Sequence, residues 1–332
     1  MFHTAGSEEP LKAVIIGCGA IAGGYDESYL GPDILTHAKA YRKHAGFRLV
    51  ACVEPNEKRR RQFMQAWGIE DGFSDIDELL SIDYDFDIAS VCAPTSEHAN
   101  ILRKLLSTPI KGVFCEKPIS DNFATSKLLV DLYAQAGVPF AVNYFRRWDE
   151  SLQSLKEAIE KGKWGALQTA ACHYGKGIRH NGSHMIDLLQ FLLGDLTPVL
   201  VSRQQRDFQD ADPTLDAILN TQGNVPIHLI GTDSHLFDVF EACLTFENGQ
   251  ISLEQGGEVV RERQVEPDHR FSGHRSLSTG AFRSSSLGDA LYRALANLYK
   301  AVKESGPLVS NSRTALAAEE VCDHLLQMST RA

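Results

Sequence analysis

The stretch Leu11-Lys-Ala-Val-Ile-Ile-Gly17-Cys-Gly19-Ala-Ile-Ala22-Gly23 decides the fold. It places a G-x-G-x-x-G/A pattern directly after an apolar, β-branched run and before a helical pattern. Gly17 permits a tight turn, Gly19 lets the backbone approach a pyrophosphate, and the small Ala22 allows close helix-strand packing. The N-terminus of the following helix supplies unpaired N–H donors to a phosphate. The stretch predicts a dinucleotide-binding turn, with the cofactor-binding residues Gly17, Gly19, Ala20 and Ile21.

The chain up to about Asn143 alternates short apolar runs with helical patterns. The runs show little in/out alternation, which is typical of strands buried on both faces. A repeated β-α pattern favours a parallel, doubly wound sheet of the α/β class, that is, a Rossmann domain. We expect its strands at Leu11–Gly17, Phe47–Val53, Phe86–Cys92, Lys111–Cys115 and Pro139–Asn143.

The pattern changes after Trp148. Strand-like stretches group together between helical stretches, which indicates an α+β domain with a large, mostly antiparallel, open sheet. We predict a dinucleotide-binding domain over residues 1–146 and a substrate-binding and oligomerisation domain over residues 147–332. No element is assigned to Gly256–Ser286, which is rich in Arg, Ser and Gly.

Composition narrows the class of partner. The 332 residues suffice for about two domains. The 33 Lys and Arg against 43 Asp and Glu give a net charge of −10, so no general positive field attracts nucleic acid or an anionic membrane. The seven cysteines contain no Cys-x-x-Cys pair, which argues against a zinc knuckle or a disulfide framework and favours the cytoplasm. We expect no metal, no nucleic acid and no membrane partner.

Glu54 follows the second expected strand directly. A carboxylate there can accept hydrogen bonds from both hydroxyls of the adenosine ribose, and it repels a 2′-phosphate. The basic run Lys58-Arg-Arg-Arg61 could instead hold such a phosphate, although a solvated helix face is the simpler interpretation. The balance favours NAD over NADP.

Two further segments come at the carboxyl ends of later strands, where ligands bind in open α/β sheets. They are Cys92–His98 and Cys115-Glu-Lys-Pro118. A partly desolvated lysine beside a cationic nicotinamide suits proton exchange with a carbinol oxygen, which makes Lys117 the candidate proton donor.

These motifs together resemble the Gfo/Idh/MocA family, the glucose-fructose oxidoreductase and inositol dehydrogenase group. The resemblance rests on Gly17–Gly23, Glu54-Pro55, Cys92–His98 and Glu116-Lys-Pro118, and on Gly182-Ser-His184-Met-Ile-Asp187 in the second domain. It implies a cofactor site that also contains Ala93, Pro94, Thr95, His98, Glu116, Lys117 and Asn143.

The resemblance also implies that Lys117 and His184 are catalytic. Many relatives carry Asp four residues before the histidine, whereas this chain has His180 there, so we include His180 as a catalytic candidate. Asp187 lies one helical turn after His184 and either orients the imidazole or serves packing.

The substrate site is expected to contain Arg146, Lys176, Arg179, Asn181 and His184. Converging cations from Lys176, Arg179, Arg146 and Arg147 would form a pocket for an anion such as the diphosphate of a nucleotide sugar. A second basic cluster, Arg261, Arg263, Arg270, Arg275 and Arg283, either helps or forms a solvated loop.

The leading hypothesis is therefore an NAD-dependent oxidoreductase that moves a hydride between the nicotinamide and a carbinol or carbonyl carbon of a sugar, cyclitol or sugar nucleotide. Two alternatives stay open. One is a reductase of imine, enone or diol-type substrates, and the other is a non-catalytic NAD(P)-binding sensor or transcriptional regulator. The resemblance also implies a homodimer or homotetramer.

Overall fold

The computed structural model describes residues 9–82 and 84–330. The chain forms two compact units. The first runs to Asn143 and also includes Gly288–Arg313, and the second comprises Tyr144–Leu287 and the residues from Thr314 on. Residues 1–8 of the first expected domain lie outside the described residues, and the functional boundary expected after residue 146 stays a prediction.

In the first unit, the described residues form a six-stranded parallel sheet in the order β3-β2-β1-β4-β5-β6. This order is that of a dinucleotide-binding doubly wound sheet. Every residue of β4 and β5 is buried, as expected for strands covered on both faces. The strands are β1 (Leu11–Ile16), β2 (Phe47–Val53), β3 (Asp71–Phe73), β4 (Ile88–Val91), β5 (Gly112–Cys115) and β6 (Phe140–Val142).

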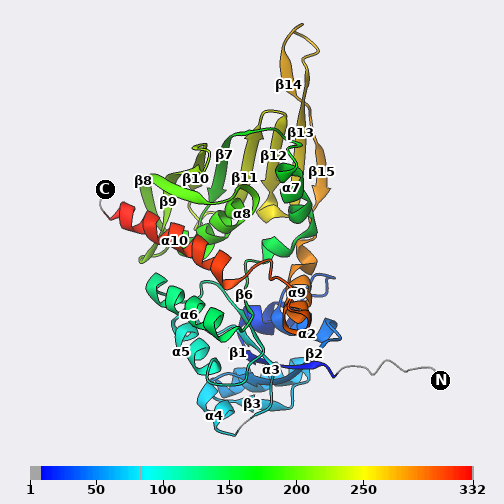
Figure 1. The fold of residues 1–332 in the computed structure, drawn as a ribbon, viewed down its shortest axis with the longest axis vertical. Coiled ribbons are helices and arrows are strands. Elements are labelled where there is room, and N and C mark those ends of the chain that lie inside the picture. The colour runs from blue at the N-terminus through cyan, green and yellow to red at the C-terminus, as the bar shows by residue number, and fades with distance from the viewer. Residues whose placement is uncertain (1–8, 83, 331–332) are drawn as a thin grey trace, which may run out of the picture. The chain divides into compact units, whose positions relative to one another are not determined.

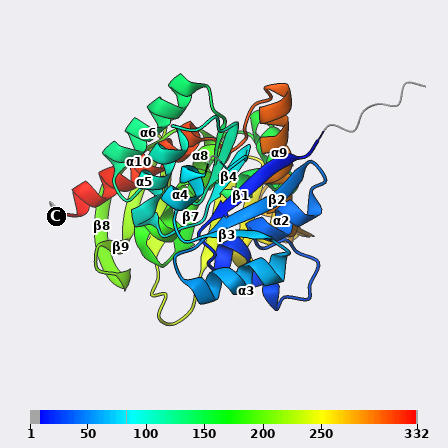
Figure 2. The same cartoon turned by 90° about the horizontal axis from the view of Figure 1, so that it is seen from below.

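Helices cover both faces of this sheet (Figure 2). Local capping sets their ends: the Asn56 side chain accepts a hydrogen bond from Arg59 N at the start of α3, and Gly68 ends the helix with a φ of 69°. The helices of this unit are α1 (Tyr25–Glu27), α2 (His37–Lys43), α3 (Glu57–Trp67), α4 (Ile76–Ser81), α5 (Thr95–Leu105), α6 (Phe123–Ala136) and α9 (Ala290–Glu304).

In the second unit, the described residues form a nine-stranded sheet in which only β7 and β10 pair in parallel. The strands are β7 (Leu167–Tyr174), β8 (Leu196–Gln209), β9 (Asp212–Thr221), β10 (Pro226–Gly231), β11 (Phe240–Phe246), β12 (Gly249–Glu254), β13 (Val259–Pro267), β14 (Arg275–Leu277) and β15 (Ala281–Ser284). Burial alternates along β11 and β12, so one face of the sheet is packed. The expected α/β class with a mostly antiparallel second sheet is confirmed.

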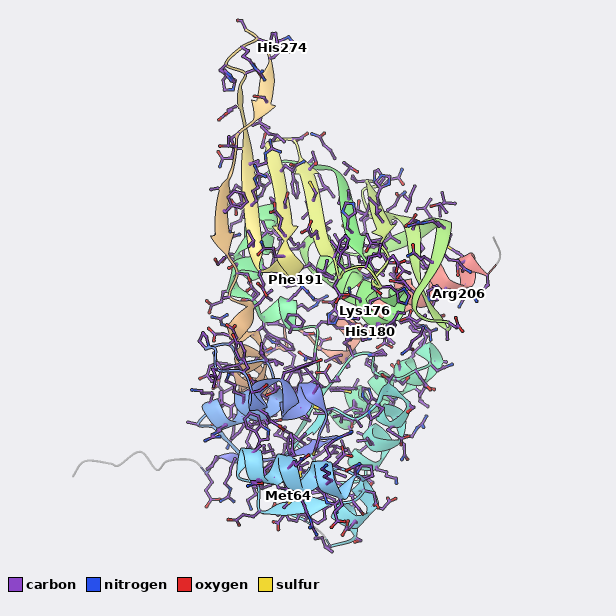
Figure 3. The ribbon with its side chains drawn as sticks, turned by 180° about the vertical axis from the view of Figure 1, so that it is seen from behind. Met64, Lys176, His180, Phe191, Arg206 and His274 are labelled. Carbon is purple, nitrogen blue, oxygen red and sulfur yellow. The ribbon has the colours of Figure 1, made fainter. Side chains whose placement is uncertain are left out.

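Helices α7 (Glu150–Glu160), α8 (Ser183–Leu193) and α10 (Ser312–Ser329) accompany this sheet. The segment Gly256–Ser286, for which no element was predicted, contains β13, β14 and β15. Strands β13 and β14 form an arm that projects past the sheet (Figure 1), and His274 lies at its tip (Figure 3). Arg261 and Arg263 of the second basic cluster donate to the backbone oxygens of Thr279 and Ser278, so the arm uses these two cations internally.

Candidate functional site

The glycine turn after β1 has two differently constrained glycines. Gly17 has a φ of +91°, and a Cβ there would lie 2.5 Å from Ala93 N, so only glycine fits. Gly19 has a φ of −81°, and no described atom lies within 4 Å of a Cβ built on it. The protein's own packing therefore does not require glycine at position 19. Close approach of a ligand such as the pyrophosphate of a dinucleotide would account for a glycine here, and that contact stays a prediction.

The expected helix after the glycine turn differs in form. Ala20–Gly24 make a π-helix in which Gly23 N and Gly24 N both donate to Gly19 O, and the three-residue α1 follows. The loop that follows α1 is held at its far end by a residue of α1. There, Leu35 N and Thr36 Oγ1 both donate hydrogen bonds to the buried carboxylate of Asp26. The sequence pattern did not predict a π-turn, because a short helix of either type shows the same run of small residues.

A cavity of about 370 Å³ lies at the carboxyl end of the first sheet. Four of the predicted cofactor residues line it, namely Gly17, Glu54, Ala93 and Pro94. They come from the ends of β1, β2 and β4, where a doubly wound sheet binds its ligand. Contact of the other predicted cofactor residues with NAD stays a prediction.

Glu54 lines this cavity and is buried. Its Oε2 accepts a hydrogen bond from Cys18 N at 3.1 Å, and its Oε1 accepts one from Asn56 N at 3.0 Å. The carboxylate therefore also fixes the backbone of the glycine turn. Arg59 lines the same cavity and lies 3.6 Å from Glu54 Oε2. One member of the basic run thus reaches the cavity, while Arg61 pairs with Glu57.

His98 is buried and links two loops at the cofactor edge of the sheet. Its Nε2 lies 2.8 Å from Ala93 O and its Nδ1 lies 2.9 Å from Pro118 O. The ring therefore ties the loop after β4 to the turn that carries Lys117. This arrangement is compatible with a loop-fixing role.

Glu116 is held in a hydrogen-bond network that sequence reasoning missed. Its Oε1 accepts from Asn143 Nδ2 at 2.7 Å and lies 2.9 Å from His37 Nε2, while His37 Nδ1 lies 3.1 Å from Ser90 Oγ. Burial alone raises the pKa of Glu116, but His37, Asn143 and the charge of Lys117 outweigh it, so the pKa lies below its usual value.

Asn143 offers a second observation that fits the cofactor. Its Oδ1 is buried and has no hydrogen-bond partner among the described residues. An unpaired buried amide oxygen is costly, and a donor such as a carboxamide would satisfy it. Lys117, half-buried on the same turn as Glu116, follows β5. NAD would thus be held by the glycine turn, Glu54 and the Glu116–Asn143 region.

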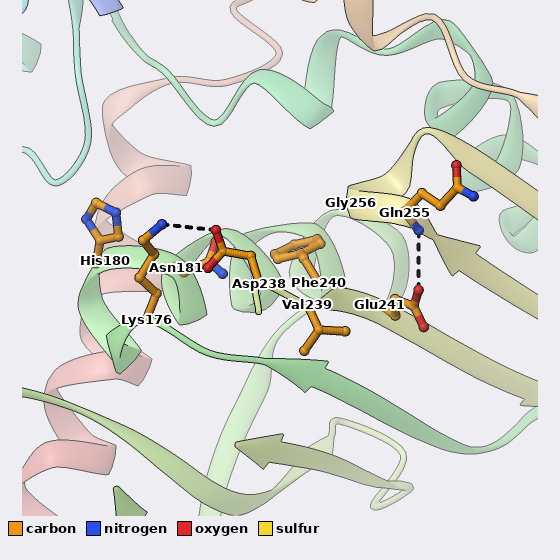
Figure 4. Close-up of a pocket in the computed structure, with 9 residues that line it drawn as sticks. All are labelled: Lys176, His180, Asn181, Asp238, Val239, Phe240, Glu241, Gln255 and Gly256. Atoms are coloured by element: carbon orange, nitrogen blue, oxygen red, sulfur yellow. Dashed lines mark hydrogen bonds and ion pairs between the residues drawn. The ribbon is translucent and has the colours of Figure 1, made fainter. Parts of the chain in front are cut away.

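The second unit has its own cavity, of about 390 Å³ (Figure 4). Three of the predicted residues line it, Lys176, His180 and Asn181, together with residues that were not predicted, among them Asp238, Phe240 and Glu241. Lys176 Nζ lies 3.2 Å from Asp238 Oδ2.

Two buried carboxylates on the hairpin of β8 and β9 hold the backbone of this cavity wall. Asp207 accepts from Lys176 N at 2.7 Å, and Asp212 accepts from Arg179 N at 2.8 Å and from His180 N at 2.9 Å. Both residues flank the hairpin turn. In the sequence, the only sign of their role is that two carboxylates stand on either side of a turn.

His180 and His184 have different surroundings. The His180 ring stacks on Phe208 at a centroid distance of 4.6 Å and is exposed. His184, in the first turn of α8, packs edge-on against Tyr144 and Phe145 at 5.3 and 5.7 Å. Their catalytic roles stay predictions.

The three arginines proposed for an anion pocket each have a partner within the second unit. Arg147 donates to both oxygens of Asp187, at 2.8 and 2.9 Å, and Arg179 pairs with Asp323 at 3.2 Å. Arg146 donates to Gly256 O. Arg146 and Arg147 are buried, and buried guanidinium groups need partners of this kind. The sequence left two roles open for Asp187, orienting the imidazole of His184 or packing. The structure shows that Asp187 forms a buried ion pair with Arg147.

Comparison with known proteins finds a similar family for the first unit. Residues 11–144 match the model of the Gfo/Idh/MocA family, described as an oxidoreductase family with an NAD-binding Rossmann fold. The match covers the Rossmann domain of this chain. The predicted resemblance and the choice of NAD as cofactor are confirmed at this level.

The curated proteins that this chain resembles include sugar and cyclitol enzymes. D-apiose dehydrogenase of Paraburkholderia graminis is 24% identical over 228 residues, which cover 64% of this chain and 57% of that protein. Myo-inositol 2-dehydrogenase of Thermotoga maritima is 32% identical over 117 residues, which cover 35% of this chain and 34% of that protein. The chain thus spans about a third to somewhat over half of the length of these relatives.

The fold as a whole also has solved counterparts. The WlbA dehydrogenase of Bordetella pertussis, solved with NADH and UDP-GlcNAcA, has a TM-score of 0.78 at 15% identity, with 98% of this chain and 97% of that chain covered. At such low identity the likeness shows the fold alone.

Two features are absent from the part of the chain that the structure describes. Within residues 9–82 and 84–330, no group of three or more His, Cys, Asp and Glu side chains is arranged to hold a metal ion. In the same ranges, no helix has the length and apolar character needed to span a bilayer.

Proposed function

We propose that the chain is an NAD-dependent oxidoreductase acting on a CH–OH group of a sugar, cyclitol or sugar nucleotide. The observation that carries this proposal is the glycine turn: Gly19 is glycine for no internal reason, and Glu54 lies in the adjoining cavity. The match of residues 11–144 to an oxidoreductase family and the sugar and cyclitol dehydrogenases among the relatives support it. When bound, NAD supplies the acceptor or donor of the hydride.

In this proposal, Lys117 and His184 are the acid/base groups that exchange the hydroxyl proton of the substrate. Lys117 follows Glu116, whose carboxylate is fixed by Asn143 and His37 and supplies a negative charge beside the ammonium group. Lys117 can thus release a proton to an oxygen or take one from it, and its positive charge stabilises negative charge that develops there.

A pair of lysine variants tests the proposal. Lys117→Ala should lower kcat by about a hundredfold or more while NAD still binds, because general acid-base groups contribute roughly that much. Lys111→Ala is the matched control, because Lys111 immediately precedes β5 at its other end and pairs with Asp87. NADH absorbance with a panel of sugars, cyclitols and nucleotide sugars is the readout.

The same assay separates the alternatives. A sensor would bind NAD in calorimetry and leave it unchanged with every compound in the panel. Unaltered turnover in Lys117→Ala would remove the lysine from the mechanism.

A further inference from the structure

The cavity of the second unit has charges of both signs on its walls (Figure 4). Among the described residues that line it, Lys176 carries a positive charge, and Asp238 and Glu241 carry negative charges. Lys176 pairs with Asp238 at 3.2 Å, and Glu241 Oε1 accepts a hydrogen bond from Gln255 N at 3.4 Å. The cation of this cavity therefore already has a carboxylate partner, and a second carboxylate stands on the same wall.

Arg146, which contacts two of the lining residues, does not change this balance. The Arg146 guanidinium is buried, donates to Gly256 O at 2.7 and 3.1 Å and lies 3.8 Å from the centre of the Phe240 ring. It thus packs behind two residues of the cavity wall and is not among the lining residues. A guanidinium engaged with a ring face and a carbonyl is a support for the wall.

The remaining lining groups suit hydroxyl groups and an apolar ring face. Asn181 and Gln255 have amide side chains, and Val239 and Phe240 add apolar surface. Carboxylates accept hydrogen bonds from hydroxyls, and amides and Lys176 can donate them. A phosphate or carboxylate placed here would meet Asp238 and Glu241, and unmatched like charges within a binding site cost affinity.

We propose that this cavity selects an uncharged polyhydroxylated group, such as the ring of a neutral sugar or cyclitol, and that Asp238 excludes sugar acids, sugar phosphates and nucleotide diphosphates by neutralising Lys176. The inference rests on the proposed function, because it narrows the substrate class of that reaction. It leaves the roles of Lys117 and NAD unchanged.

The test compares neutral and anionic compounds of otherwise similar shape in the full-length chain with NAD. The probes are glucose and myo-inositol against glucuronate, glucose 6-phosphate and UDP-glucose, and the readout is kcat/KM from NADH absorbance. The wild-type chain should turn over a neutral compound and give every anion a kcat/KM lower by about tenfold or more.

Charge variants then locate the selectivity. Asp238→Asn keeps the shape and frees Lys176, so the ratio of kcat/KM for glucuronate over glucose should rise by about tenfold, and added salt should reduce the gain. Lys176→Gln should move the ratio in the opposite direction. Glu160→Gln on α7 is the control, because Glu160 is a comparably exposed carboxylate paired with Lys156, and it should leave the ratio unchanged.

The outcomes separate the two proposals. An anion preferred by the wild-type chain, or an unchanged ratio in both Asp238→Asn and Lys176→Gln, overturns the selectivity and leaves the oxidoreductase standing. If calorimetry detects bound NAD and no compound alters it, the proposed function is rejected and this inference is rejected with it.

Discussion

Gly17 and Gly19 lie two residues apart, but only Gly17 is required by the protein's own backbone packing. Gly17→Ala places a Cβ against Ala93 at a positive φ, so we expect a loss of about 3 kcal/mol in unfolding free energy. Gly19→Ala meets no described atom within 4 Å, so the chain should keep its Tm and bind NAD more weakly. Thermal unfolding and calorimetry check the pair. A Tm loss in Gly19→Ala equal to that of Gly17→Ala would contradict the assignment.

We expect Glu54 to set the cofactor preference. In Glu54→Gln the amide oxygen can still accept from a backbone N–H, but the negative charge beside Arg59 is gone. Arg59 can then pair with a 2′-phosphate, so the Kd for NADP should tighten by about tenfold relative to that for NAD. Glu57→Gln, which removes the exposed partner of Arg61, is the control. Unchanged relative Kd values would show that Glu54 does not discriminate.

Asp187 makes stability depend on pH. Burial raises its pKa from 3.8 to about 6, although Arg147 opposes the rise. The folded chain therefore binds this proton more tightly than the unfolded chain does. Its stabilising contribution is complete below 3.8 and is lost as pH rises through about 6. Asp187→Asn does not titrate, so the unfolding free energy of wild type minus variant should fall over this pH range.

Urea unfolding at several pH values measures that difference. The variant also leaves Arg147 without its carboxylate, which adds an offset that does not vary with pH. Asp195→Asn, at an exposed position, supplies the control. A difference that grows as pH rises would mean that Arg147 lowers the pKa of Asp187 in the folded state.

At the scale of elements, the π-helix Gly177–Gly182 depends on the neighbouring hairpin. Asp212 accepts two backbone N–H groups from it and is buried. Asp212→Ala leaves both groups unpaired, so we expect a loss of about 2 kcal/mol and faster amide exchange over Gly177–Gly182. Asp210→Ala, exposed beside the same hairpin turn, should change neither. Unaltered exchange in Asp212→Ala would refute the dependence.

Elements with a strong periodic pattern were predicted closely. The expected strands Phe47–Val53 and Lys111–Cys115 correspond to β2 and β5. The three-residue β3 and the strand β9 were missed. A three-residue strand has too few residues to show a period, and the polar residues of β9 hide its alternation.

The residues of the candidate site also differ in how well the sequence predicts them. Gly17 and Glu54 could be placed because a strand end and a turn fix their positions locally. The pairing of Lys176 with Asp238 could not, because it joins residues 62 positions apart through the strand order of the second sheet. The four cations looked alike in sequence, and only tertiary contacts show that Lys176, Arg147 and Arg179 pair with carboxylates whereas Arg146 donates to a backbone carbonyl.

For the whole molecule, the first unit needs a helix from far along the chain. Helix α9 buries Leu295 and Leu298 completely, and a Cβ on Gly112 of β5 would lie 3.3 Å from Leu298 Cδ1. A fragment that ends at Asn143 should therefore bind a hydrophobic dye and lose NAD binding. Joining residues 288–313 to it by a flexible linker should restore both properties. Tight NAD binding by the short fragment would contradict this prediction.

Helix α9 is also synthesised late, long after the strands of the first unit. The ribosome makes the strands of the first sheet early, yet the helix that completes this unit emerges only after the whole of β7 to β15. At ordinary rates of translation the interval is roughly 10–30 s. During that interval the nascent sheet carries an uncovered apolar patch. We therefore expect the nascent chain to need chaperones for longer than a contiguous Rossmann domain does.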